Sequence, residues 1–245
     1  MTEEQLYKKF AGYYDKIYEE LDHEKESKFI KWVVNKHRGS EGNLLLDMAC
    51  GTGRHAHFLK DDFKILGIDI NKEMLKIARE KVPDVEFITG DMKKLDLGRK
   101  FDSVICVFSA MNYNVTFEEL KLTLANFYGH LNKGGVLIFD LGINKDNWVE
   151  GHLSVDTVVE GDLKIARISK ARLEGEVLNS NFIFLVKENG KIDFDIDEHK
   201  LGIFEIKKVY ELMENMGFET FIYSNFKDEI YEIGNGERPV FVGVK

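Results

Sequence analysis

The chain has few of the residues that interrupt or cross-link a protein. Its two prolines are Pro83 and Pro239, so no proline-rich linker separates domains. Its two cysteines, Cys50 and Cys106, lie outside any Cys-x-x-Cys pattern, which argues against a disulfide framework and a structural zinc site. We therefore expect no bound metal, and such sparse cysteine content indicates a cytoplasmic protein.

Long apolar runs and an excess of positive charge are also missing. The longest apolar runs have the length of a strand, and the charged N-terminus has no apolar secretory core. The 43 acidic residues outnumber the 34 lysines and arginines, which gives a net charge of −9. This charge disfavours a partner held by a general positive field, so we expect neither a nucleic acid nor a membrane as partner.

The first 152 residues contain an alternation of helix-like and strand-like segments. Residues 1–38 are expected to form two helices, and one apolar stripe at three- and four-residue steps runs through Tyr7, Phe10, Tyr14, Ile17 and Leu21. From Leu44, buried-strand runs such as "NLLLDM" and "FDSVICVFSA" alternate with helical runs such as "NKEMLKIAREK". This alternation predicts an α/β fold with a Rossmann-like, doubly wound parallel sheet.

Local signals mark the ends of the expected helices. Asn71 is the expected N-cap of one helix, and Thr116 with Glu119 forms a capping box at the start of another. The "NKGG" segment, residues 132–135, is expected to stop that second helix before a fifth strand, "VLIFDL".

Residues 153–203 alternate polar and apolar side chains. Asn189-Gly190 between two such runs predicts a two-residue hairpin turn, and therefore an inserted antiparallel β-sheet. A helix at 205–218 and strands at 219–225 and 238–245 should then return to the main sheet. The expected organisation is a helical cap (1–38), a Rossmann-like domain (39–152 and 204–245) and an inserted β subdomain (153–203).

A glycine loop, "LLLDMACGTGRH", follows the first expected strand. Gly51, Gly53 and Ala56 satisfy the G-x-G-x-x-G/A pattern between a strand and a helix, where backbone amides can approach a ligand. This pattern predicts a nucleotide-like ligand but does not identify it.

Acidic residues at the ends of three strands narrow the choice of ligand. Asp47 directly precedes the loop, where a carboxylate would repel a pyrophosphate but suit an ammonium or sulfonium group. Asp69 follows about 20 residues later and can accept hydrogen bonds from ribose hydroxyls. Asp91 ends the third strand, with Met92 beside it to pack a base. These residues favour a cationic nucleoside over ATP or a nicotinamide dinucleotide.

Further segments carry a resemblance to a known family. "LGIDINKEML", "FITGDM" and "LNKGGVLIFD" resemble motifs of class I S-adenosylmethionine-dependent methyltransferases, and "YYDKIY", "EHKLGIF" and "ERPVFVGV" resemble the bacterial nucleotide-linked amino-sugar N,N-dimethyltransferases. The resemblance implies a seven-stranded methyltransferase sheet and S-adenosylmethionine as cofactor, with S-adenosylhomocysteine as its product. It implies methylation of a small-molecule acceptor, with an amine, including that of an amino sugar, as the expected group.

The resemblance also assigns residues to the cofactor. Tyr14 would help to hold its amino-acid end, Asp69 and Ile70 its ribose, and Asp91 and Met92 its adenine. The complete predicted set, with the glycine loop, the helix after the second strand and the end of the fourth strand, is Tyr14, Asp47, Ala49, Cys50, Gly51, Gly53, Asp69, Ile70, Met74, Asp91, Met92, Phe108 and Ser109.

Two segments depart from the amino-sugar enzymes. Ala110–Tyr113 stands where those enzymes carry a Ser-Ile-Gly-Tyr-like turn, and "DLGINKDNW" stands where they have a proline and paired tryptophans. Both segments should border the acceptor. The identity of the acceptor, N- versus O-methylation and the number of methyl groups therefore stay open.

An amine acceptor must lose a proton, because an ammonium ion has no lone pair with which to attack. His199 can serve as the base or form an ion pair with the acids beside it, and Asp140 ends the fifth strand at the edge where α/β sheets bind ligands. His55 and His57 are expected at exposed helix positions. The candidates for the catalytic role are His199, Tyr14, Tyr113 and Asp140.

Other classes of function remain as alternatives. One is methylation of RNA, DNA or protein, although the Asn/Asp-Pro-Pro-Tyr element of base methyltransferases is absent. A nicotinamide-dependent oxidoreductase is disfavoured by Asp47 and Asp91. A binding protein that keeps the fold without chemistry is a further alternative. The inserted sheet could act as a lid, as the contact of a homodimer, or as both.

Overall fold

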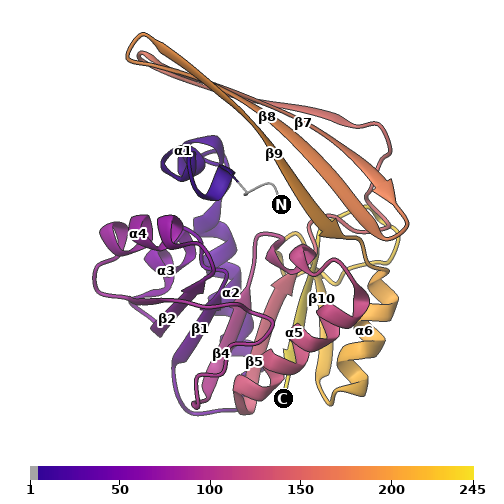
Figure 1. The fold of residues 1–245 in the computed structure, drawn as a ribbon. Coiled ribbons are helices and arrows are strands. Elements are labelled where there is room, and N and C mark those ends of the chain that lie inside the picture. The colour runs from indigo at the N-terminus through magenta and orange to yellow at the C-terminus, as the bar shows by residue number, and fades with distance from the viewer. Residues whose placement is uncertain (1–4) are drawn as a thin grey trace.

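The computed structural model describes residues 5–245, so the first four residues of the expected cap lie outside the described part of the chain. The elements form two separate sheets and the helices around them (Figure 1). In chain order they are η1 (Gln5–Tyr7), α1 (Ala11–Ile17), α2 (His23–His37), β1 (Leu44–Met48), α3 (Arg54–Leu59), β2 (Lys64–Asp69), α4 (Lys72–Lys81), β3 (Glu86–Thr89), β4 (Phe101–Cys106), η2 (Ala110–Tyr113), α5 (Phe117–His130), β5 (Leu131–Asp140), β6 (Leu153–Glu160), β7 (Leu163–Glu174), β8 (Val177–Glu188), β9 (Lys191–Gly202), α6 (Ile206–Asn215), β10 (Glu219–Ser224) and β11 (Pro239–Val244).

The main sheet has seven strands in the order β10-β11-β5-β4-β1-β2-β3. Strands β1 to β5 are parallel, and β11 runs antiparallel to both of its neighbours, β5 and β10. Apolar residues of α5 and α6 pack on one face, and those of α2 pack on the other. This confirms the expected Rossmann-like, seven-stranded sheet with helices on both faces.

The central strands form because their side chains are apolar on both faces of the sheet. All six residues of β4 are buried, as a strand covered by helices on both faces requires. Because β1, β2, β3 and β4 run parallel, their carboxyl ends meet at one edge of the sheet. Ligands of open α/β sheets bind at this edge.

The local helix signals are confirmed in part. Thr116 Oγ1 accepts a hydrogen bond from the Glu119 amide at 3.1 Å, as a capping box requires. Asn71 occupies the N-cap position of α4, but its side chain does not cap the helix. The Asn71 amide donates to Asp69 Oδ1 at 2.8 Å, so the helix start is held by Asp69.

The segment "NKGG" follows the end of α5, as expected, but it is already part of the next strand. Helix α5 does end at His130, but residues 132–135 already belong to β5. Gly134 adopts a left-handed φ of 76°, and a side chain there would collide with the Gly39 backbone, which donates to the Gly134 carbonyl. The glycines therefore permit a close backbone approach within an irregular strand.

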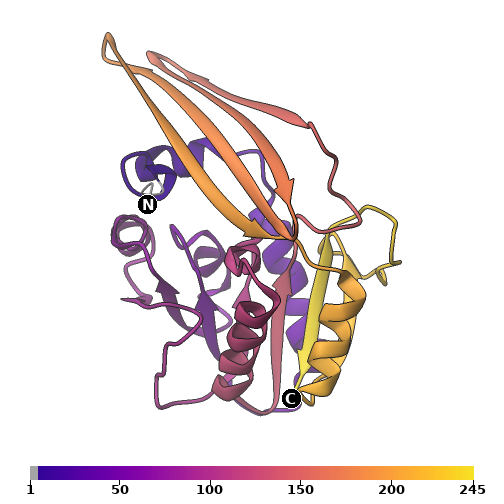
Figure 2. The same cartoon turned by 45° about the vertical axis from the view of Figure 1, so that its right-hand side comes forward.

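The second sheet contains β6, β7, β8 and β9, all antiparallel in sequence order. Glu188 pairs with Lys191, so Asn189-Gly190 forms the expected two-residue turn, with φ values of 52° and 71°. Figures 1 and 2 show this sheet extending beyond the carboxyl-terminal edge of the main sheet, with α1 beneath it.

The N-terminal helices pack against the inserted sheet. Leu6 and Phe10 are almost fully buried against Ile165 and Phe184 of that sheet. The apolar stripe predicted from the sequence ends before Leu21, which is exposed. No helix among residues 5–245 combines the length and apolarity that a membrane span needs.

Candidate active site

A cavity of about 300 Å³ opens at the carboxyl ends of the main strands, next to α1. Its size falls at the lower end of the range typical of small-molecule sites. Nine of the thirteen predicted cofactor residues line it. The lining residues are Tyr7, Tyr14, Ala49, Gly51, Asp69, Ile70, Asn71, Met74, Gly90, Asp91, Met92, Lys93, Val107, Phe108, Ala110 and Tyr113.

The glycine loop turns sharply around one side of this cavity. Ala49 has a φ of 58°, a left-handed conformation that is costly for a residue with a side chain. Gly53 does not line the cavity: a side chain there would press on Phe87 and Ala78, so this glycine serves close packing. The Cys50 side chain is likewise buried in the core beside Phe87.

Asp69 connects the two loops that frame the cavity. Its Oδ2 accepts from the Gly51 amide at 2.9 Å, and its Oδ1 accepts from the Asn71 amide at 2.8 Å. Burial raises the pKa of Asp69, although these backbone hydrogen bonds oppose the shift. Each carboxylate oxygen can still accept a further hydrogen bond, so Asp69 is placed to receive ligand hydroxyls.

Asp47 lies behind the loop and outside the cavity lining. Its side chain is buried, and its Oδ2 has no hydrogen-bond partner among residues 5–245. Burial, reinforced by the charge of Asp69, raises the pKa of Asp47 to about 8. A buried carboxyl group with an unpaired oxygen gains most from a cationic group bound nearby.

The third predicted acid is held in a tight turn at the end of β3. Asp91 Oδ1 accepts from the Lys93 amide at 2.9 Å, and Met92 packs against the main core. Gly90 and Lys93 line the cavity here and were not singled out from the sequence, although they flank the predicted pair.

Aromatic rings form the opposite wall. The ring of Phe108 contacts Tyr18 and Tyr14 edge-on, with centroid distances of 5.1 Å and 6.5 Å. Phe108 and Ser109 both adopt left-handed conformations, with φ values of 66° and 62°. Burial raises the pKa of Tyr14 well above its ordinary value, so Tyr14 stays protonated and is a poor base on its own.

A row of hydrogen bonds leads from the cavity into the inserted sheet. Tyr7 and Tyr113, which both line the cavity, share a 2.6 Å hydrogen bond between their hydroxyl groups. The Tyr113 hydroxyl contacts His199 Nδ1 at 2.6 Å, and His199 Nε2 contacts Asp197 Oδ2 at 2.9 Å. A carboxylate beside Nε2 favours the proton on that nitrogen and leaves Nδ1 to accept from Tyr113.

His199 lies between an acid and the cavity. Its Nε2 hydrogen-bonds to Asp197, and it reaches the cavity through Tyr113 although it does not line it. Tyr7 and Asp197 were missed as site residues. Tyr7 shares the apolar stripe with Tyr14, so the sequence carried a signal for it.

Asp140 lies outside the cavity lining and is engaged elsewhere. It is fully buried, and its Oδ2 accepts from the Ser109 amide at 2.9 Å and from Arg238 Nε at 2.8 Å. These contacts disfavour Asp140 as a base, because ionised Asp140 balances the Arg238 charge. Ser109, also outside the lining, stands between Asp140 and the cavity wall.

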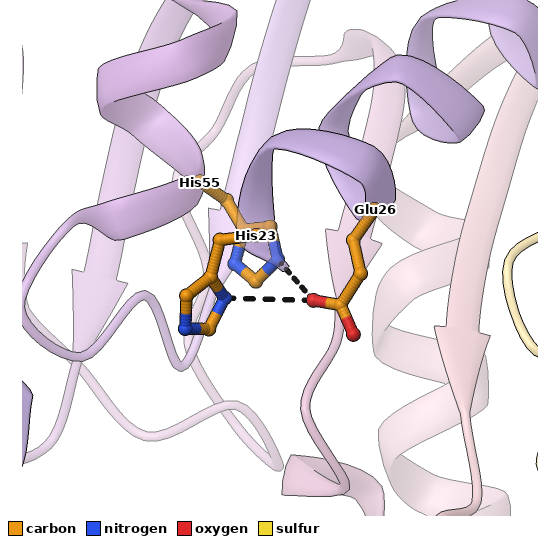
Figure 3. A group of neighbouring side chains, drawn as sticks. All are labelled: His23, Glu26 and His55. Carbon is orange, nitrogen blue, oxygen red and sulfur yellow. Dashed lines mark hydrogen bonds and ion pairs between the residues drawn. The ribbon is translucent and has the colours of Figure 1, made fainter. Parts of the chain in front are cut away.

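His55 is a correction to the sequence prediction, whereas His57 is exposed as expected. His55 is buried, and its Nε2 contacts Glu26 Oε2 at 2.9 Å (Figure 3). His23 Nδ1 lies 3.5 Å from the same oxygen. Sequence periodicity missed the contact because α2, which carries Glu26, packs on α3 and covers this face.

The turn Ala110–Tyr113, whose sequence differs from that of the amino-sugar enzymes, has a clear role in the structure. The buried Asn112 amide donates to the carbonyls of Ile143, at 2.7 Å, and Gly202, at 2.8 Å. Asn112 thus ties the turn to the loop after β5 and to the end of β9. The two segments that depart from the amino-sugar enzymes meet at this point.

The sheet order, the strand-end acids and the cavity define a class I S-adenosylmethionine-dependent methyltransferase fold. Comparison with known proteins agrees: a family described as a methyltransferase domain matches residues 45–135. The solved structure of DesVI from Streptomyces venezuelae superimposes with a TM-score of 0.84 at 30% identity, covering 96% of this chain and 98% of that one. S-adenosylmethionine-bound CalS10 from Micromonospora echinaspora, an amino pentose methyltransferase, gives a TM-score of 0.80 at 26% identity over 94% and 95% of the two chains.

Curated relatives narrow the family. The dTDP-3-amino-3,4,6-trideoxy-alpha-D-glucopyranose N,N-dimethyltransferase of Streptomyces venezuelae is 34% identical over 209 residues, which are 84% of this chain and 85% of the relative. The dTDP-3-amino-3,6-dideoxy-alpha-D-glucopyranose N,N-dimethyltransferase of Streptomyces fradiae is 29% identical over 91% of this chain and 85% of its own length. The chain belongs to the S-adenosylmethionine-dependent methyltransferase family that includes these amino-sugar enzymes.

Proposed function

We propose that the protein methylates the amino group of a small molecule, and that this acceptor is a nucleotide-linked amino sugar. The observation that carries the proposal is the row Tyr113, His199 and Asp197, which begins at the cavity and continues into a buried acid. A proton acceptor at the cavity is what an amine acceptor needs. The names of the two curated relatives, which act on dTDP-linked amino sugars, support the choice of acceptor.

We further propose the residues that hold the cofactor, which supplies an activated methyl group when bound. Asp69 is suited to the ribose hydroxyls, because both of its oxygens are fixed by backbone amides. Asp91 and Met92 are suited to the adenine. Asp47, with its unpaired buried oxygen, favours the positively charged amino-acid end. Cys50, Gly53 and Ser109 support the wall from behind.

In this proposal the chain's own groups accept the acceptor's proton. Tyr113 takes it at its hydroxyl oxygen while passing its own hydrogen to His199 Nδ1. Asp197 then stabilises the resulting imidazolium through Nε2. The aromatic wall around Phe108 keeps water away from the reacting groups.

The proposal can be tested by incubating the protein and S-adenosylmethionine with a dTDP-linked amino sugar and with the analogue that carries a hydroxyl in place of the amine. Mass spectrometry should show one or two added CH₂ units on the amine alone. Tyr113→Phe is expected to lower kcat by about a hundredfold, the contribution typical of a proton-transfer group. Methylation of the hydroxyl analogue, or full activity of Tyr113→Phe, would contradict the proposal.

The outer face of the inserted sheet supports a second proposal, that the protein forms a homodimer. Val155, Ile168, Ile183 and Ile196 are paired side by side across all four strands, and all are exposed. Leu185 and Phe194 extend the same face. Contiguous apolar patches of this kind are rare on the surface of monomers, and a second copy of the same strands would match their shape.

The predicted division into cap, Rossmann-like domain and inserted subdomain is retained as a proposal, with the cap and the inserted sheet as one roof over the cavity. The cytoplasmic location also stays a prediction. Cys50 and Cys106 are both buried and unpaired, which is compatible with it.

A further inference from the structure

A row of buried and half-buried charged groups connects α2 to the wall of the cavity. His55 Nε2 contacts Glu26 Oε2 at 2.9 Å, and Arg238 Nη1 donates to Glu26 Oε1 at 3.1 Å. Arg238 Nε donates to Asp140 Oδ2 at 2.8 Å, and this oxygen also accepts from the Ser109 amide at 2.9 Å. Helices α2 and α3 are thereby linked to the turn that follows β4.

The charges in this row depend on one another. Glu26 and Asp140 share one cation, because the guanidinium of Arg238 donates to both carboxylates. Burial alone would raise the pKa of Glu26, but the contacts with His23 and His55 and the charge of Arg238 hold it well below its ordinary value. Removing one member leaves an uncompensated buried charge, which is costly.

The turn at the end of the row needs such support. Phe108 and Ser109 are consecutive residues with left-handed φ values, a conformation that is strained for residues other than glycine. The ring of Phe108 packs against His23 and the Arg238 guanidinium, each at a centroid distance of 5.8 Å. A side chain at Gly142 would overlap Ser109 Oγ, so the turn is also confined from the other side.

We propose that Glu26, together with His55 and Arg238, is a positioning residue for the methyltransferase reaction. None of the three lines the cavity. They act through Asp140, which accepts from the Ser109 amide and holds Phe108 and Ser109 in the conformation that shapes the aromatic wall. The inference rests on the cofactor occupying this cavity and is independent of the acceptor.

A metal ion is the alternative interpretation of His23, Glu26 and His55, because their donor atoms lie within 4.8 Å of one another (Figure 3). Two observations favour hydrogen bonding. The His55–Glu26 distance of 2.9 Å is that of an ordinary hydrogen bond, and the guanidinium of Arg238 already occupies the other oxygen of Glu26.

The test is calorimetric titration of Glu26→Gln with S-adenosylhomocysteine, next to Glu24→Gln as the control. Glu24 is exposed on the same helix and forms an ion pair with Lys28 on the helix surface. We expect Glu26→Gln to weaken binding about tenfold, which corresponds to about 1.4 kcal/mol. Glu24→Gln should bind like the wild type. Because no acceptor is used, a wrong acceptor assignment would not affect the result.

A second substitution that relieves the turn distinguishes a positioning role of Glu26 from a general contribution to the stability of the protein. Glycine adopts a left-handed φ without strain, so in a Ser109→Gly background the Glu26→Gln substitution should weaken binding by less than threefold. If Glu26→Gln does not fold, Gly142→Ala disturbs the same turn from the other side and should weaken binding to a similar extent. An unchanged affinity in Glu26→Gln, an undiminished effect in the Ser109→Gly background, or stoichiometric metal in the purified protein would overturn the proposal.

Discussion

Asp69 fixes two loops at the scale of single atoms, since each of its oxygens accepts from a different backbone amide. Asp69→Ala should therefore weaken S-adenosylhomocysteine binding by roughly 1–3 kcal/mol, through loss of a charged acceptor. Titration calorimetry measures this directly. Asp61→Ala, an exposed position on the neighbouring loop, is the control. Equal affinities in the two variants would mean that the ribose is held elsewhere.

Asp47 should make the stability of the protein depend on pH. Its folded pKa of about 8 lies above its unfolded value near 3.8, so the folded state binds the extra proton between these values. The stability that the Asp47 proton contributes is fully present below about pH 4 and is lost as the pH rises to about 8. Asp47→Asn removes this titration. At pH 8.5 the variant should gain about 4 kcal/mol relative to the wild type, compared with the difference at pH 5, since about three pH units are crossed at about 1.4 kcal/mol each.

Urea unfolding at pH 5, 7 and 8.5 measures the effect of Asp47. The comparison uses the difference between variant and wild type, because other groups titrate equally in both. Parallel pH profiles of the two proteins would show that Asp47 is already ionised at neutral pH. S-adenosylmethionine should reduce the difference, because a cation nearby favours the ionised carboxyl group.

At the scale of elements, α1 is fastened over the glycine loop by one carboxylate. Asp15 accepts from Thr52 Oγ1 at 2.7 Å and from Arg54 Nε at 2.9 Å, and it also pairs with Lys81. Asp15→Asn should loosen α1, which carries Tyr14, and increase the rate of S-adenosylhomocysteine dissociation about tenfold. Stopped-flow fluorescence can follow this rate. Glu20→Gln, exposed just after α1, should leave it unchanged, and an unchanged rate in Asp15→Asn would show that α1 does not control release.

The sequence predicts elements well where one local rule decides them. The apolar run of β4, the capping box at Thr116 and the hairpin at Asn189-Gly190 each follow from neighbouring residues. The sequence predicts an element poorly where contact with a distant segment of backbone sets the local conformation. The glycines of residues 132–135 look like a helix stop, but the approach of Gly39 makes them part of a strand. Likewise, His55 looks exposed until α2 covers it.

At the scale of the whole molecule, one half of the proposed site depends on contacts between residues that are far apart in the sequence, and sequence motifs do not reveal such contacts. The acids of the proposed cofactor half lie within one stretch of strands and loops, so their spacing in the sequence is enough to single them out. The proposed proton-accepting half joins residues from the N-terminus, η2 and β9: Tyr7 and Tyr113 are 106 positions apart, and the Leu6 amide donates to Asp197 across 191 positions. Only the tertiary fold brings these together.

At the scale of the whole molecule, the apolar outer face of the inserted sheet predicts a homodimer. A stable dimer buries about 800 Å² per partner, and a four-stranded face with exposed isoleucines and Phe194 offers apolar area of that kind. Wild-type protein should sediment as a dimer, and Phe194→Asp should sediment as a monomer, because a charge would be buried at the contact. Lys121→Asp, which adds an acid on the exposed side of α5, should remain dimeric. A monomeric wild type would leave the sheet as a roof over the cavity alone. A dimeric Phe194→Asp would place the contact on another surface.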